Sequence, residues 1–336
     1  MKITFIGAGR WAMTLALVLH RKNIAISMWE YSEERLNILK KTKKLNDLPE
    51  SVIIPDTINI SNDLTDSLKL SEVIFFAIPS QELRSVLTKM WSIVDIKKSP
   101  ILVSAIKGLE NNSYKRISTI IKEFFPDLPV VVLAGPGIPF EIAQGKPASL
   151  VAASQEHNVA DIIQNLLSDE NLRVYTHPDV VGVELGGALK NVIAIAAGIS
   201  DGLKLGDNAK SALITRGLSE ITRLGIALNA NPMTFAGLSG IGDVIVTSYS
   251  PYSRNHILGE QIGQGIILEE TIKSLNGIAE GVMTAKSAKG LGSKMRVELP
   301  IIEQMYSILF EQGDIEKSIK KLMARPLKRE MNYEKF

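Results

Sequence analysis

The sequence predicts an α/β protein in which a doubly wound domain comes first and an all-α domain follows. Short apolar runs alternate with helical segments as far as His177, and from Asp179 onward the chain has helical patterns only. The length of 336 residues fits about two domains of roughly 150 residues each. We therefore expect one domain at residues 1–178 and a second at residues 179–336.

The expected strands of the first domain are continuous apolar runs, which are typical of strands buried on both faces of a parallel sheet. They are Ile3–Ile6, Ile24–Trp29, Val73–Ile78, Ile101–Ile106 and Val130–Gly135, with a further strand pair at Ser149–Ala153 and Arg173–Thr176. Helical spacing occurs between them at Trp11–His20, Glu82–Met90 and Ser113–Phe124. This alternation of strand and helix predicts a doubly wound sheet.

The second half opens with the longest expected helix, Asp179–Leu203, which is rich in Gly and Ala. Glycine inside a helix costs about 1 kcal/mol relative to Ala. We therefore expect this helix to pack closely against another backbone. The later helices are expected at Ala209–Leu228, Asn255–Ile262, Leu268–Leu275, Thr284–Gly290, Ile301–Phe310 and Ile315–Leu322.

Composition excludes several classes of function. The formal net charge is +2, so the chain lacks the electrostatic footprint of a nucleic-acid-binding protein. It contains no cysteine, and the spacing of its four histidines suggests no metal motif. No apolar run reaches the roughly 18–20 residues of a membrane span, and a strand at the very start leaves no room for a signal peptide. We expect a cytoplasmic protein without a metal or a membrane span.

A dinucleotide fingerprint follows the first strand directly and opens a helix. In Gly7-Ala8-Gly9-Arg10-Trp11-Ala12, the first glycine allows a tight turn and Gly9 lets a pyrophosphate approach the backbone. Ala12 keeps the helix close to the sheet, and the helix N-terminus attracts phosphate. The alternative is that these are ordinary turn glycines. The strand before, the helix after and an acidic residue at the end of the second strand favour a Rossmann-type nucleotide site.

The cofactor preference rests on two signals that conflict. Glu30 lies 18 residues past Ala12, where a carboxylate binds the ribose hydroxyls of NAD and repels the 2′-phosphate of NADP. Arg10 and the Ala12 ending of the motif point toward NADP. We expect NAD or NADP to bind, with a slight preference for NAD.

Two lysines stand in unusual surroundings. A nicotinamide enzyme must orient a carbonyl and supply a proton, and a lysine of depressed pKa can do so. Lys107 directly follows an expected strand, and Lys190 lies inside the Gly- and Ala-rich helix among Leu189, Val192 and Ile193. The alternative is a solvated surface lysine, which these apolar neighbours make a poor explanation of Lys190.

With these residues, the chain resembles the bacterial-type NAD(P)-dependent sn-glycerol-3-phosphate dehydrogenase family over nearly its whole length. The resemblance rests on several motifs in a fixed order. They are GAGRWA at the start, AIPS at Ala77–Ser80, AIKGLE at Ala105–Glu110, AGPGIPFEIAQG at Ala134–Gly145, the KNV helix at Gly182–Gly202, ALITRGLSE at Ala212–Glu220, GLSGIGDVIVT at Gly237–Thr247, SRN at Ser253–Asn255 and AEGV at Ala279–Val282.

The resemblance implies an oxidoreductase that interconverts sn-glycerol 3-phosphate and dihydroxyacetone phosphate and supplies glycerol 3-phosphate for phospholipid synthesis. It implies that Lys190 is the catalytic proton donor and acceptor. The implied substrate contacts are Lys107, Gly135, Gly137, Lys190, Asp243, Ser253, Arg254 and Asn255. The implied cofactor contacts, with the fingerprint, are Gly7, Gly9, Arg10, Trp11, Ala12, Glu30, Tyr31, Lys107, Arg254, Ile278 and Glu280. We also expect a small phosphate substrate and a homodimer.

Two of these assignments have simpler alternatives. Ser253 and Asn255 begin an expected helix, where they could serve as ordinary N-cap residues, although Arg254 between them suits a phosphate. Asp243 could cap the turn Gly240–Gly242, but we prefer a carboxylate that binds substrate or positions Lys190.

The chain departs from the family pattern at a few positions. Arg10 replaces a small Ser, Gly137 replaces Thr or Ser, and Glu30-Tyr31 replaces a more basic pair. Two other functions stay open: a related hydroxy-acid or polyol-phosphate dehydrogenase, and a nucleotide-sensing module without turnover. A phosphate-free substrate panel would discriminate the first, and the Lys190, Asp243 and SRN set argues against the second.

Overall fold

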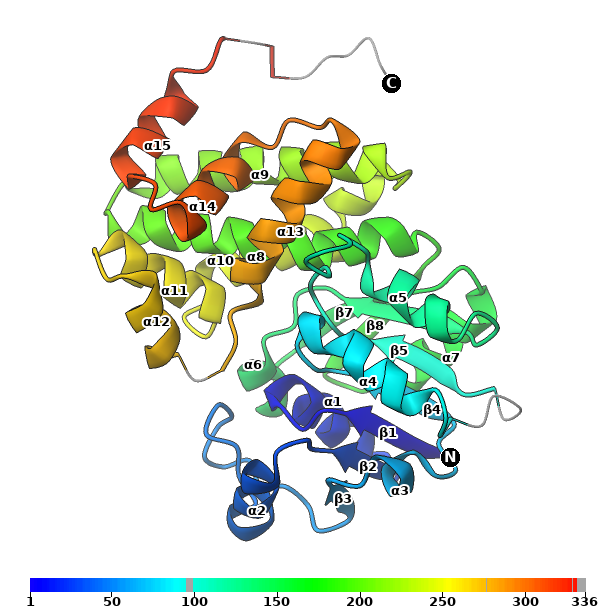
Figure 1. Cartoon of the computed structure of the whole chain (residues 1–336). Coiled ribbons are helices and arrows are strands. Elements are labelled where there is room, and N and C mark those ends of the chain that lie inside the picture. Colours follow the sequence, from blue (N-terminus) through cyan, green and yellow to red (C-terminus); the bar gives the residue numbers. More distant parts are fainter. Residues whose placement is uncertain (95–98, 276, 328, 331–336) are drawn as a thin grey trace.

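The computed structural model describes residues 1–94, 99–275, 277–327 and 329–330. One part is a sheet covered by helices, and the other is a group of helices that begins with a long central helix (Figure 1). The last strand ends at His177 and the central helix begins at Val180, so the change of architecture occurs between these residues. Within the described residues no strand follows His177, as the all-α prediction requires.

The sheet has eight strands in the order β3-β2-β1-β4-β5-β6-β7-β8. The strands are β1 (Lys2–Ile6), β2 (Ala25–Trp29), β3 (Ile58–Ser61), β4 (Val73–Phe76), β5 (Ile101–Ser104), β6 (Val130–Ala134), β7 (Ala148–Ala153) and β8 (Leu172–His177). Every neighbouring pair is parallel except β6 and β7, which pair antiparallel. The order of the first six strands is that of a Rossmann-type dinucleotide-binding fold.

Each face of the sheet is buried under its own apolar core. Phe75 packs into one core, with residues of α1 (Arg10–His20) and α7 (His157–Leu167). Its neighbours Ile74 and Phe76 pack into the other core, with residues of α4 (Leu83–Met90) and α5 (Ile117–Phe124). Successive side chains of a strand point to opposite faces, so a strand covered on both sides must be apolar throughout. The continuous apolar runs therefore predicted these strands correctly.

The structure corrects the predicted elements of the first half at several places. The short strand β3 was not predicted, because its sequence INIS alternates apolar and polar residues at the edge of the sheet. The helix predicted from Ser113 begins only at Ile117, because a turn closed by a bridge between Leu109 and Arg116 precedes it. The remaining helices of this half are α2 (Glu33–Thr42), α3 (Leu64–Leu68) and α6 (Pro139–Ala143), with a 3-10 turn η1 (Ser80–Glu82).

The helical part is built around α8 (Val180–Gly202). The other elements are α9 (Asp207–Ala227), η3 (Pro232–Ala236), η4 (Leu238–Gly242), α10 (Asp243–Tyr249), α11 (Arg254–Gly263), α12 (Leu268–Ser274), α13 (Glu280–Met295), α14 (Pro300–Phe310) and α15 (Ile315–Met323). Helix α13 is longer at both ends than the predicted Thr284–Gly290.

The small residues of α8 permit the close packing that the sequence predicted. A Cβ atom on Gly198 would lie 2.1 Å from the carbonyl oxygen of His256 in α11, and one on Gly259 would lie 2.0 Å from that of Ile195. Neither contact is possible for a larger residue, so α8 and α11 can approach only as glycine-lined backbones. This packing brings the start of α11 alongside the middle of α8.

Of the described helices, α8 alone is long and apolar enough to cross a membrane, and 89% of its most apolar window is buried inside the protein. Its N-terminal end packs on the sheet, where Val183 joins a small core with Val132 and Val151. Helix α8 is therefore the central core helix of the molecule (Figure 1), and Lys190 lies in its first half.

Candidate active site

A cleft of about 990 Å³ lies between the carboxyl ends of the strands and the helices α8 and α11. This position is where open α/β sheets bind their ligands, and the volume suits a cofactor with a small substrate. The predicted site residues that line it are Gly7, Gly9, Arg10, Trp11, Glu30, Tyr31, Lys107, Gly137, Lys190, Ser253, Arg254, Asn255, Ile278 and Glu280. Ala12, Gly135 and Asp243 do not line it, because they lie buried behind other groups.

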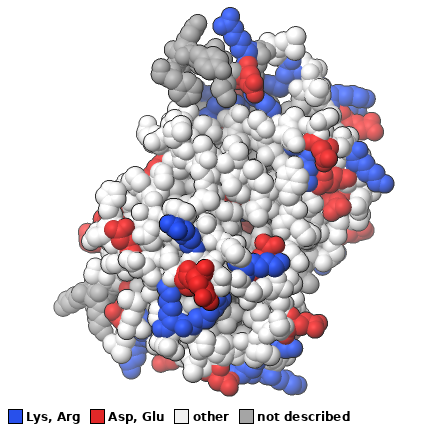
Figure 2. All heavy atoms as spheres, turned by 180° about the vertical axis from the view of Figure 1, so that it is seen from behind, with Lys and Arg blue, Asp and Glu red and all other residues white. Residues whose placement is uncertain are grey.

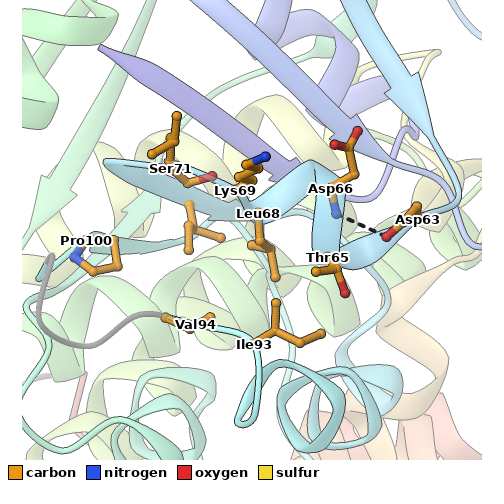
Figure 3. Close-up of a pocket in the computed structure, with 11 residues that line it drawn as sticks. Asp63, Thr65, Asp66, Leu68, Lys69, Ser71, Ile93, Val94 and Pro100 are labelled. Carbon is orange, nitrogen blue, oxygen red and sulfur yellow. Dashed lines mark hydrogen bonds between the residues drawn. The ribbon is translucent and has the colours of Figure 1, made fainter.

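A second cavity of about 400 Å³ lies by α3 and holds none of the predicted site residues. Figure 3 shows its lining, in which Leu68 faces Ile93 and Val94, and Asp63 accepts the backbone N–H of Asp66 at 3.0 Å. Asp63 is thus the N-cap of α3, a structural use of a carboxylate. We assign no function to this cavity.

The fingerprint has the local geometry that a pyrophosphate requires. Gly7 has a φ of +105°, and a Cβ there would lie 2.7 Å from the carbonyl oxygen of Ala77. Gly9 is the N-cap of α1 with no side-chain cap, and nothing lies within 4 Å of the position that its Cβ would take. Ala12 is fully buried against the sheet. The helix start therefore offers free N–H groups and open space to an anion.

Glu30 lies at the end of β2 and is buried. Its Oε1 accepts the backbone N–H of Ser32 at 3.0 Å, and its Oε2 is 3.7 Å from the Nε of Arg35. Arg35 was not among the predicted residues, yet it also lines the cleft. The neighbouring Tyr31 is exposed and lies edge-on to Trp29, with Lys89 5.6 Å above its ring centre.

Three side chains form an ionic cluster at the floor of the cleft, in which Lys190 and Asp243 are buried and Lys107 is partly buried. The Nζ of Lys190 donates to Oδ1 of Asp243 and, at 2.5 Å, to Oγ1 of Thr247. The Nζ of Lys107 donates to Oδ2 of Asp243 at 2.6 Å and to the carbonyl oxygen of Gly135 at 2.9 Å. Each ammonium has three donors, so each keeps one N–H for a ligand in the cleft.

The cluster determines the acidity of Lys190. The pKa of Lys190 is lowered to about 7: burial lowers it most, the Asp243 carboxylate opposes this effect, and the positive charge of Lys107 adds to it. A pKa near 7 suits a group that must both give and take a proton at neutral pH. The backbone N–H of Asp243 ends η4, but its carboxylate binds both lysines and makes no hydrogen bond to the Gly240–Gly242 turn, so the carboxylate is not a cap of that turn.

The SRN triplet opens α11, as its sequence suggested. The Oγ of Ser253 accepts the backbone N–H of His256 at 3.3 Å, which is an N-cap. The side chain of Asn255 donates to Oδ1 of Asn191 at 2.9 Å and accepts the N–H of Gly281 at 2.9 Å. Both residues thus have structural partners as well as a place at the cleft.

Arg254 is the member of the triplet whose charge faces the cleft. Its Nη2 donates to Oδ2 of Asp47 at 2.5 Å, and its Nη1 reaches the carbonyl oxygen of Ile278 at 3.5 Å. Its Nε is buried with no hydrogen-bond partner among the described residues. Asp47 lies in the segment between α2 and β3, so this ion pair joins the two parts of the molecule across the cleft.

A second contact across the cleft is made by Glu280, the first residue of α13. Its carboxylate accepts the backbone N–H of Ser80 at 3.0 Å and the hydroxyl of Ser80 at 2.7 Å. Burial raises the pKa of Glu280, and these two hydrogen bonds oppose that rise. Nearby, Ile278 is exposed at the cleft.

Close packing explains why position 137 is a glycine. A Cβ there would lie 3.0 Å from the indole of Trp11 and 3.0 Å from the side chain of Leu150. The indole ring therefore occupies the space beside Gly137 that a hydroxyl side chain would need. The Nε1 of Trp11 is itself buried without a hydrogen-bond partner among the described residues.

Comparisons with known proteins agree with this geometry. A family model described as the NAD-dependent glycerol-3-phosphate dehydrogenase N-terminus matches residues 2–160, and the corresponding C-terminus model matches residues 179–320. This chain belongs to the NAD-dependent glycerol-3-phosphate dehydrogenase family.

Individual relatives are similar along the full length. The chain is 43% identical over 332 residues to an NAD(P)+-dependent glycerol-3-phosphate dehydrogenase of Thermoanaerobacter sp. strain X514, which covers 99% of each protein. A solved glycerol-3-phosphate dehydrogenase of Coxiella burnetii superposes with a TM-score of 0.93 at 32% identity and covers 96% of this chain and 99% of its own. A D-mandelate dehydrogenase, at 15% identity and a TM-score of 0.63, shares the fold alone.

Some residues of the site were not predicted from the sequence, and these are the partners that hold the predicted site residues in place. Thr247 had a signal, because it follows Asp243 by four residues on one face of α10. Asn191 also had one, as the neighbour of Lys190; it donates to the carbonyl oxygen of Lys107 at 3.1 Å. Ser80 ends the AIPS motif, but its partner Glu280 lies 200 residues away, and Asp47 had no signal, because its partner lies 207 residues away.

Proposed function

We propose that this chain interconverts sn-glycerol 3-phosphate and dihydroxyacetone phosphate, with NAD or NADP as the hydride carrier. The observation that carries the proposal is that Lys190 and Lys107 both bind Asp243 at the floor of the cleft. The dinucleotide fingerprint lines the same cleft. The family and its full-length relatives support the same reaction. The product, glycerol 3-phosphate, is then supplied for phospholipid synthesis.

The cleft fits the cofactor at the fingerprint. The open face of Gly9 and the uncapped N-terminus of α1 would hold the pyrophosphate, and Glu30 would accept hydrogen bonds from the adenosine ribose. When bound, the nicotinamide supplies or accepts the hydride. We propose Arg10, Trp11, Tyr31, Ile278 and Glu280 as further contacts of the cofactor.

Lys190 handles the proton. During reduction its ammonium donates to the oxygen of the substrate carbonyl, and during oxidation the free amine accepts the proton back. Asp243 and Thr247 take up two of the three donors of Lys190, so the third points to the cleft by elimination. Lys107 orients the same oxygen or its neighbour with its remaining N–H.

The substrate phosphate binds at the start of α11. The guanidinium of Arg254 offers a planar fork to phosphate oxygens, and the helix N-terminus adds N–H groups and a positive dipole end. Ser253 and Asn255 hold the backbone of this turn through the contacts described above. We also propose that Gly137 shapes the wall beside the reacting carbon, and that Gly135 acts from behind this wall, where its carbonyl oxygen accepts a hydrogen bond from Lys107.

The test is NADH and NADPH oxidation with dihydroxyacetone phosphate. Lys190→Ala should lose on the order of 10²–10⁴-fold in turnover while cofactor binding persists. Lys210→Ala is the matched control, because Lys210 is also a buried lysine in an ion pair, with Asp201, outside the cleft. Near-normal turnover in Lys190→Ala would contradict the proposal.

The phosphate site has its own test. Arg254→Ala should raise the KM for dihydroxyacetone phosphate strongly, and Arg254→Lys should restore it only in part because a point charge lacks the fork. Unchanged KM values in both variants, with only stability altered, would contradict the phosphate site and show that the SRN triplet serves only as a helix cap.

We further propose that the protein is a cytoplasmic homodimer. Ile241, Ile245 and Tyr249 are exposed at a spacing of four residues along η4 and α10, which forms an apolar stripe. The rear face of the molecule has a broad area without charged side chains (Figure 2). Sedimentation of the wild type and of Ile245→Glu tests the dimer: a monomeric wild type contradicts it.

A further inference from the structure

The segment between α2 and β3 reaches across the cleft. It rises from α2 toward the helical part (Figure 1) and carries Asp47 to the guanidinium of Arg254, with Nη2 and Oδ2 2.5 Å apart. Two buried residues, Leu48 and Ile54, anchor the segment in the core of the sheet domain. The amide of Ile54 also donates to the carbonyl oxygen of Lys43 at 2.8 Å. The backbone of the segment is therefore anchored beside Arg254, while the Asp47 side chain is bound there by the ion pair alone among the contacts of the described residues.

The guanidinium of Arg254 is constrained on its other sides. Its Cζ would lie only 2.6 Å from a Cβ on Gly277, so the group is packed flat against that backbone. Its Nε is buried without a partner among the described residues, and its contact with the carbonyl oxygen of Ile278 is long, at 3.5 Å. The carboxylate of Asp47 is thus the ion-pair partner that balances its charge.

A second guanidinium shares this environment. The pKa of Arg10 is lowered to about 10: burial lowers it most, the positive charge of Arg254 lowers it as well, and the negative charge of Asp47 opposes both effects. Arg10 and Arg254 together carry two positive charges, and Asp47 carries one negative charge between them. An incoming phosphate dianion would be attracted by both guanidiniums and repelled by Asp47.

We propose that Asp47 is a displaceable counter-ion that competes with phosphate groups for Arg254 and so sets the affinity of the cleft for its phosphorylated ligand. In the empty cleft the carboxylate neutralises a guanidinium that has few other partners. A phosphate that binds the fork of Arg254 must replace this carboxylate, so part of its binding free energy is spent on breaking the ion pair. The inference rests on the proposed role of Arg254 in binding the substrate phosphate.

The experiment measures phosphate affinity in the full-length protein. Titration calorimetry with inorganic phosphate and with dihydroxyacetone phosphate is done on the wild type, Asp47→Asn and Glu50→Gln. Glu50 lies on the same segment, is exposed and does not line the cleft, so it controls for the loss of one negative charge. A partly buried ion pair of this kind should change affinity by about 3- to 10-fold.

We expect Asp47→Asn to bind both ligands about 3- to 10-fold more tightly, to lower the KM for dihydroxyacetone phosphate similarly, and to lose this gain at high salt. Glu50→Gln should behave like the wild type. In an Arg254→Ala background, Asp47→Asn should have no effect. A gain of affinity cannot arise from a damaged fold.

Unchanged or weaker phosphate binding by Asp47→Asn overturns the inference, even when the wild type reduces dihydroxyacetone phosphate normally. In that case Asp47 only positions Arg254, and the proposed reaction stands. If the wild type neither binds nor reduces dihydroxyacetone phosphate, the proposed function and this inference both fail. An equal gain in Glu50→Gln would also overturn the inference, because net charge alone would then explain it.

Discussion

Replacement of Asp243 by Asn should change the pH at which the enzyme can reduce its substrate. Asp243 is fully buried and is the carboxylate that both Lys190 and Lys107 bind. Two opposite charges about 4 Å apart interact by about 4 kcal/mol at an effective dielectric of about 20. A change of about 1.4 kcal/mol in the free energy of ionisation corresponds to one pKa unit. Loss of the carboxylate should therefore lower the pKa of Lys190 from about 7 to roughly 4.

The sign follows from the form that reacts. In the proposed mechanism reduction requires the Lys190 ammonium, so the wild-type rate should be level below pH 7 and fall tenfold per pH unit above it. In Asp243→Asn the rate should fall over the whole range from about pH 5.5 to 9, with a loss of roughly 500-fold at pH 7. The titration of the substrate phosphate is common to both proteins and cancels in their ratio.

The assay is kcat for dihydroxyacetone phosphate reduction at saturating cofactor across this pH range. Glu184→Gln is the matched control, because Glu184 is a buried carboxylate on the same helix as Lys190 but pairs with Arg116 and Ser118 outside the cleft. A uniform loss of rate in Asp243→Asn, with the bend still near pH 7, would refute the electrostatic reasoning and leave Asp243 a structural residue.

Three further predictions concern other parts of the molecule. Glu30→Ser should shift the ratio of kcat/KM values toward NADPH, since it removes a carboxylate that would face the 2′-phosphate and frees Arg35 at 3.7 Å; a tenfold wild-type preference for NADPH would contradict the assignment. Gly137→Ala should lower the free energy of unfolding in urea by about 1–3 kcal/mol, because its methyl group presses on Trp11 and Leu150; unchanged stability would show that the wall yields. Burial raises the pKa of Glu220 from 4.5 to about 7. The folded state then holds its proton more tightly than the unfolded state, so this residue should lower stability by about 3 kcal/mol as pH rises from 4.5 to 7, and Glu220→Gln should abolish that slope; parallel stability curves for the two proteins would exclude it.

Much of the nucleotide-binding part could be predicted from sequence because its signals are local. The tight turn at Gly7 and the open approach at Gly9 depend on a few consecutive residues. A strand buried on both faces must be apolar along its length, so the continuous apolar runs identified these strands. The edge strand β3 was missed because one of its faces is polar, and the antiparallel direction of β7 has no local sequence signal.

The chemistry of the site, by contrast, depends on contacts between distant residues. A lysine among apolar neighbours on α8 could be recognised, but its pKa depends on Asp243, 53 residues away, and on Lys107 beyond it. Likewise Arg254 could be predicted as a phosphate ligand from the sequence, whereas its ion-pair partner Asp47 is 207 residues away. Local spacing encodes turns and strands, but the burial and charge that surround a side chain arise only when the chain packs. The candidate reactive residues could therefore be predicted from the sequence, whereas their acidity and ion-pair partners are determined by the folded structure.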